Sequence, residues 1–141
     1  MRKNTIPMLT CVAVMSLAGC QTNSRDQILQ ANSSQVQLRS YQTRAFDTVD
    51  REKTLRTVIA TLQDLGFVVD KADATLGTVS GTKLDGYQMR MTVSLRPRGE
   101  QQTLVRANAQ YNLTAVEDPL PYQGFFESLS KAMFLEAHQV D

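Results

Sequence analysis

The sequence has few residues of the kinds that build metal centres. Its 141 residues include two cysteines and one histidine, His138, which lies three residues from the C-terminus. A zinc site needs three or four His, Cys or carboxylate ligands held in register. We therefore expect no metal and no cofactor.

Residue patterns that indicate catalysis are also missing. A catalytic triad combines a nucleophile, a histidine and an acid. No Ser or Thr lies in a recognisable pattern with His138, the single histidine, and an acidic residue. Glu117 and Asp118 precede a proline, and they fit the charged start of a helix better than a catalytic pair. The stretch from Gly77 to Gly81 lacks the lysine and the helix start that a phosphate loop needs. We predict that the protein is not an enzyme, and an enzyme acting on the cell wall or on lipids is the weakest alternative.

The chain has no excess of charge of either sign. It carries 15 Lys and Arg residues against 14 Asp and Glu residues. Removal of the N-terminal segment would delete Arg2 and Lys3 and leave 13 basic residues. This balance gives no electrostatic basis for binding nucleic acid.

The apolar run near the N-terminus is too short to span a membrane. Residues 6–17 make 12 positions, whereas a spanning helix needs roughly 20. Arg2 and Lys3 precede the run, and the small residues Ala18 and Gly19 follow it. This order is typical of a secretory signal peptide.

The motif that closes this run, Leu17-Ala18-Gly19-Cys20, resembles a lipobox, the signal of bacterial lipoproteins with a type II signal peptide. The resemblance implies cleavage before Cys20, a diacylglyceryl thioether on its sulfur and an acyl group such as palmitate on its new amino terminus. More than one chain matters because a single chain anchors only marginally. Gln21 in place of an aspartate implies the outer membrane, with the domain facing the periplasm or the cell surface. An ordinary secretory signal that contains a cysteine is the alternative.

Composition divides the chain into a signal peptide (1–19), a lipidated cysteine with a flexible polar tether (20–40) and one globular domain (41–141). In residues 21–40, 12 of 20 are Gln, Asn, Ser or Thr. Such a segment buries too little apolar surface to offset the entropy of ordering. As a coil it spans about 25 Å.

The domain is expected to begin with a strand over residues 41–47 and a helix capped by Asp50. The helix carries one apolar stripe: Leu55, Val58, Ile59, Leu62 and Leu65. Thr57 falls on its polar side. Gly66 is free to take the positive φ that ends a helix, and Phe67 is expected to pack back on Leu62.

Four strands are then expected over residues 67–70, 76–83, 87–96 and 105–113. The last two alternate apolar and polar residues, which indicates one buried and one wet face. Asp118-Pro119 starts a final helix whose apolar residues are Tyr122, Phe125, Phe126, Leu129 and Met133. The order β-α-β-β-β-β-α predicts an α+β fold, an antiparallel sheet of about five strands with two helices packed on one face.

This order resembles, in topology only, the helix-grip domains of outer-membrane assembly lipoproteins. The stretches Phe46-Asp47-Thr48, Leu62 to Phe67 and Tyr122 to Phe126 resemble small proteobacterial lipoproteins. Neither resemblance brings catalytic residues with it, and likeness of fold does not establish function.

Two surfaces are candidates for binding a partner. Phe134 and Leu135 lie off the stripe of the last helix, either buried in a groove or exposed as an apolar patch. Arg90, Arg96 and Arg106 are expected on the polar sheet face. Arginine suits carboxylate, glycan or peptide-backbone recognition, although a solvated face has the same pattern.

These observations predict a lipid-anchored, non-catalytic accessory module of an envelope assembly, export or efflux complex, with an envelope protein as partner. The alternative is a carrier of a small apolar ligand or lipid. Its cavity would lie between helices and sheet, with Met89, Met91, Met133 and the aromatic residues as its lining.

Overall fold

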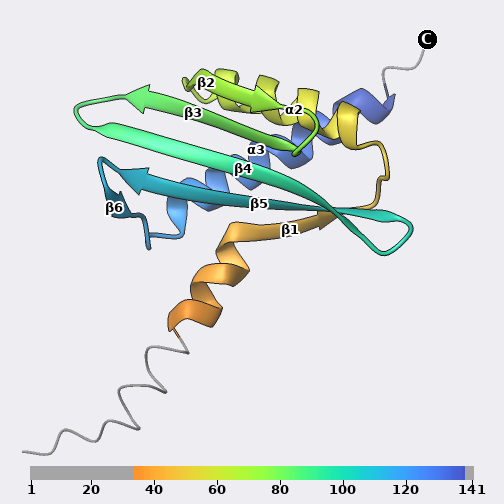
Figure 1. Cartoon of the computed structure of the whole chain (residues 1–141), viewed down its shortest axis with the longest axis horizontal. Helices are drawn as coiled ribbons and strands as arrows, with labels where there is room; N and C mark the ends of the chain where they lie inside the picture. Colours follow the sequence, from red (N-terminus) through yellow and green to blue (C-terminus); the bar gives the residue numbers. More distant parts are fainter. Residues whose placement is uncertain (1–33, 139–141) are drawn as a thin grey trace, which may run out of the picture.

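The computed structural model describes residues 34–138, with side chains as far as residue 134. It shows an α+β domain in which helices α2 and α3 lie on one face of an antiparallel sheet (Figure 1). The elements are β1 (Thr43–Phe46), α2 (Arg51–Asp64), β2 (Val68–Asp73), β3 (Thr78–Leu84), β4 (Gln88–Arg98), β5 (Gln102–Tyr111), β6 (Thr114–Ala115) and α3 (Leu120–His138). The strands are ordered β1-β5-β4-β3-β2, and β6 also pairs with β5. The predicted fold class is confirmed, with β6 as a strand that the pattern did not predict.

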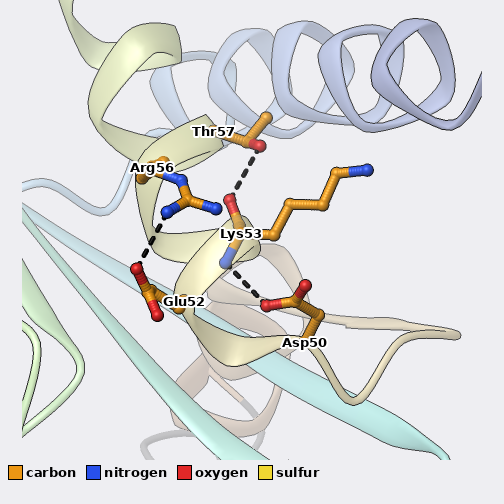
Figure 2. Close-up of polar contacts among 5 residues, drawn as sticks. All are labelled: Asp50, Glu52, Lys53, Arg56 and Thr57. Carbon is orange, nitrogen blue, oxygen red and sulfur yellow. Dashed lines mark hydrogen bonds and ion pairs between the residues drawn. The ribbon is translucent and has the colours of Figure 1, made fainter. Parts of the chain in front are cut away.

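Helix α2 begins and ends where its sequence predicts. The Asp50 carboxylate accepts a 2.8 Å hydrogen bond from the Lys53 amide, which satisfies one of the free N–H groups of the first turn (Figure 2). At the other end Gly66 has a φ of 84°. The Phe67 amide donates to the Leu62 carbonyl over 2.9 Å, as a Schellman motif requires.

Thr57 corrects one prediction for this helix, because it is buried and not on an exposed polar side. Thr54 and Thr61 are buried as well. Each threonine hydroxyl donates to the carbonyl four residues earlier, over 2.8 to 3.0 Å, and Figure 2 shows the bond from Thr57 to Lys53. A hydroxyl satisfied within its own helix can be buried without a loss of hydrogen bonding, so these residues extend the apolar stripe.

The central strands β4 and β5 give the sheet one apolar and one polar face. Their register pairs Val93 with Ala107 and Leu95 with Val105, and all four side chains are buried beneath the helices. The alternate residues lie on the outer face, which no described element covers. The predicted division into a buried and a wet face is confirmed.

Strand β2 forms one edge of the sheet and contains a bulge. Its register with β3 shifts between Val69 and Lys71, opposite Gly81 and Ser80. A Cβ on Gly81 would lie 3.1 Å from the Val68 carbonyl oxygen and 3.2 Å from Phe67 Cβ. Gly81 in β3 therefore permits a close approach of the backbone that follows α2.

The described end of the predicted tether differs from a coil, because residues 34–42 are helical. Leu38 and Tyr41 pack against the core, and Gln42 is buried. The strand expected from residue 41 consequently begins at Thr43. Most of the polar residues of this helix face solvent, so composition alone gives little sign of its packing.

Helix α3 supplies the largest side chains of the core. Tyr122, Phe125, Phe126 and Leu129 are all buried, and Met133 packs partly against them. The Leu120 amide donates to the Asp118 carboxylate over 3.0 Å, which confirms the predicted start of the helix. The stripe predicted from spacing is the buried face of α3.

Candidate functional site

A largely apolar cavity of about 310 Å³ opens at one end of the domain, between the sheet and both helices. The residues that line it come from the end of α2, the β3–β4 and β5 ends of the sheet and the start of α3. They are Leu65, Phe67, Lys83, Asp85, Tyr87, Met89, Met91, Tyr111, Pro121, Gly124 and Phe125. Figure 1 shows these parts of the ribbon converging at the end of the sheet that carries the β3–β4 and β5–β6 connections.

Small residues lie beside the cavity residue Met91 and in the first turns of α3. Met91 is paired with Gly81 on β3 and with Ala109 on β5, so neither neighbour on the inner face has a side chain larger than a methyl group. Above the sheet, Gly124 lies in the first turns of α3, and a Cβ built there would meet nothing within 4 Å. Gly124 itself lines the cavity, so this position offers room for a larger side chain.

Two tyrosines stand at the wall nearest the strand ends. The rings of Tyr87 and Tyr111 meet edge to face, with centroids 4.6 Å apart and planes at 79°. Burial, together with the Tyr87 hydroxyl, raises the pKa of Tyr111 above its usual 10.0. The Tyr111 phenol is therefore neutral at physiological pH, and both residues present apolar ring surface with a polar tip.

The cavity wall also holds one cation and one carboxylate. Lys83 donates from Nζ to the Leu65 carbonyl over 3.1 Å, at the end of α2 where the helix dipole favours positive charge. An ammonium has three donors, so Lys83 keeps donors for a ligand. Asp85 follows in the connection between β3 and β4 and lines the same cavity.

This set of side chains is suited to holding an apolar group beside a polar or charged one. Methionine and aromatic side chains adapt to varied apolar shapes. Among the described residues, no group of three or more His, Cys, Asp or Glu is placed to hold a metal ion.

The predicted arginines do lie on the outer sheet face, but they do not form one cluster. Arg106 pairs with Ser94, and Arg96 lies two residues further along β4, so these two are diagonal neighbours. Arg90 lies nearer the start of β4, opposite Gln110 on β5. Its Nε lies 3.8 Å from Asp70 Oδ2, in an exposed ion pair.

Phe134 lies on the outside of the last turns of α3, with 62% of its surface exposed. It borders a groove of about 490 Å³ together with Phe46, Asp47, Thr48, Lys53 and Met133. Leu135 belongs to α3, but its side chain lies outside the described part, as does Cys20. Met133, predicted with Met89 and Met91 in a cavity lining, borders this groove instead of the cavity.

The sequence pattern pointed to Met89, Met91 and the aromatic residues, but not to Lys83 or Gly124. Gly124 could have indicated the cavity. A glycine within a helix lowers stability relative to alanine, and a Cβ at this position would meet no atom within 4 Å.

Comparison with protein-family models gives no match for this chain, and comparison with curated proteins gives none either. Within residues 34–138, none of the helices is long and apolar enough to cross a membrane.

Proposed function

We propose that this protein is a lipid-anchored lipoprotein of the bacterial outer membrane whose domain binds, without catalysis, an apolar ligand in the cavity between its helices and sheet. The observation that supports this proposal most directly is the cavity. Its volume of about 310 Å³ falls in the range of small-molecule sites, roughly 300 to 1,000 Å³, and its mixture of apolar walls and a few polar groups is typical of them.

The anchor is supported by the lipobox-like motif that ends at Cys20. A Cys20→Ser variant should block lipid labelling and leave unprocessed precursor. Labelling that is unchanged in this variant, or a mature wild-type protein that is unlipidated and soluble in the periplasm, contradicts the anchor.

Filling the cavity tests the binding function. A Gly124→Leu variant places a side chain where a Cβ meets no atom within 4 Å, and it replaces a helical glycine by a better helix former. We therefore expect a folded protein that no longer binds the uncharged fluorescent probe N-phenyl-1-naphthylamine. Gln123→Leu, which adds the same side chain at the exposed neighbouring position, should bind the probe like the wild type.

A wild-type chain that does not bind the probe contradicts the proposal. So does a Gly124→Leu variant that binds it as well as Gln123→Leu does.

A second function, an accessory module that binds an envelope protein partner, is favoured by the uncovered outer sheet face. Arg96 and Arg106 are diagonal neighbours there, and neither forms an ion pair within the described residues. Paired arginines suit a carboxylate-bearing surface. Crosslinking in membranes should recover a stoichiometric partner, and Arg96→Ser with Arg106→Ser should reduce that recovery. Recovery of the protein alone contradicts this function.

A further inference from the structure

The end of the domain that holds the cavity also exposes large apolar side chains. Leu84 is 80% exposed, Leu113 95% and Leu120 68%, and Tyr87 is 55% exposed. Leu84 lies between the cavity residues Lys83 and Asp85, and Leu120 precedes Pro121. Leu113 belongs to the connection from β5 to β6. We call these four residues the apolar rim.

The apolar rim is gathered on one end of the molecule. Figure 1 shows the β3–β4 and β5–β6 connections at the same end of the sheet, and the Asn112 amide donates to the Gln88 carbonyl over 2.9 Å, which ties the two connections together. Apolar side chains exposed together around a concave apolar site mark a surface that contacts a partner or a membrane.

Charge at this end favours a zwitterionic partner over an anionic one. Lys83 and Asp85 line the cavity, and Asp118 is near enough to help raise the pKa of Tyr111. Two carboxylates beside one ammonium do not attract an anionic bilayer. They match a phospholipid headgroup that carries both an ammonium and a phosphate.

The length of chain before the described domain limits how far it can lie from a bilayer. Residues 21–33 separate Cys20 from the first described residue. Even fully extended, 13 positions reach at most about 45 Å, little more than the diameter of a domain of this size. An anchor at Cys20 thus keeps the apolar rim within reach of the membrane surface.

We infer that the apolar rim docks on a bilayer of zwitterionic phospholipid and that the cavity takes up one of its acyl chains, with Lys83 and Asp85 facing the headgroup. This inference rests on the proposed apolar-ligand function and names the ligand. Three leucines and a tyrosine give weak attachment by themselves, and stable membrane association usually takes a second anchor, which the N-terminus supplies.

Methionine methyl NMR provides a direct test. The full chain is labelled at its methionine methyl groups and reconstituted into phosphatidylcholine nanodiscs with a nitroxide near the acyl-chain terminus. The signals of Met89 and Met91, which line the cavity, should be lost, whereas that of Met133, which borders a different groove, should be retained. Replacing Leu84 and Leu113 by Asp should restore the two lost signals.

The matched control replaces Leu76 and Val49 by Asp. Both are exposed, and they lie at the opposite end, where the Arg51 side chain bonds the Thr75 carbonyl. This control should keep the wild-type pattern. Retention of the Met89 and Met91 signals in the wild type, or equal loss at Met133, overturns the inference.

Failure of this inference is distinguishable from failure of the proposed function. Probe binding that Gly124→Leu abolishes, together with unchanged methionine signals in the nanodisc, leaves the apolar site in place. That result assigns it to an apolar segment of a protein partner or a free apolar molecule, and it overturns the lipid assignment.

Discussion

The side-chain amide of Gln42 donates a 3.4 Å hydrogen bond to the hydroxyl of Tyr122, a residue 80 positions later in the chain. The same hydroxyl donates to the Val116 carbonyl over 2.7 Å and accepts from the Ala109 amide over 3.2 Å. One buried oxygen thereby joins the helix before β1, strand β5, the segment before α3 and α3 itself.

Replacing Tyr122 by Phe should therefore destabilise the domain more than the loss of one ordinary hydrogen bond. The substitution leaves the buried Gln42 amide and the Ala109 N–H without this partner, and we expect a loss of about 2 kcal/mol in urea unfolding. Tyr41→Phe is the control, because Tyr41 is only partly buried and should change stability little. Equal stability of the two variants would contradict the role of the Tyr122 hydroxyl.

Gly77 should be more sensitive to alanine than Gly99, although both have positive φ, 67° and 61°. A Cβ on Gly77 would lie 2.5 Å from Arg51 Nη2, whereas a Cβ on Gly99 meets nothing within 4 Å. Both variants carry the cost of a left-handed backbone, about 1 kcal/mol. Gly77→Ala also displaces the guanidinium that donates to the Thr75 carbonyl over 2.7 Å.

Thermal unfolding of the two glycine variants measures this difference. In an Arg51→Ala background the extra sensitivity of Gly77 should disappear, since neighbouring residues couple in a double-mutant cycle. Persistence of the full difference without Arg51 would show that the contact is not its cause.

Asp50→Ala should lower the free energy of unfolding by about 1 kcal/mol, the usual cost of an N-cap. Glu52→Gln serves as the comparison variant. It removes the exposed ion pair between Glu52 and Arg56, whose atoms lie 2.8 Å apart (Figure 2). Exposed pairs of this kind contribute less, about 0.2 to 1 kcal/mol. Chemical denaturation should rank the aspartate above the glutamate, and the reverse order would contradict the cap.

Stability should fall as pH rises past 10 because of Tyr111. Its pKa in the folded protein is raised above 10.0 by burial and by Tyr87. Above pH 10 the unfolded chain loses this proton first, so the unfolded state is favoured. Ultraviolet difference absorbance should show Tyr111 titrating above its usual pKa of 10.0, and Tyr111→Phe should remove that phase together with part of the alkaline loss of stability. A titration unchanged by this substitution would refute the assignment.

Local patterns predicted the elements of this fold whose neighbours along the chain decide their structure. The α2 stripe from Leu55 to Leu65, its glycine terminus and the alternation in β4 and β5 all express a regular period, and burial follows that period. The side of the sheet that faces the helices was also predictable, because each strand has one apolar face.

Features created by contacts between distant segments were not predictable in this way. The helix before β1 has a polar composition, and it is positioned by Leu38, Tyr41 and Gln42 packing on a core assembled later in the chain. Thr57 is buried because its hydroxyl is satisfied by Lys53.

The cavity was predicted only as part of an alternative function, with Met89, Met91, Met133 and the aromatic residues as its lining. Its lining residues come from segments that lie far apart in the chain, between Leu65 and Phe125, and no local pattern shows that they lie together. Lys83 was likewise assigned to a strand without a role, because its bond to Leu65 exists only in the folded domain.

The bulge in β2 has a consequence for how densely this protein can be crowded. An edge strand offers its free backbone groups to the edge of another molecule, and growth of a shared sheet leads to insoluble fibres. The register shift between Val69 and Lys71 breaks the spacing of those groups, and the charged Asp70 and Lys71 side chains are exposed at the same place. Many copies can therefore stand side by side without their sheets fusing into one.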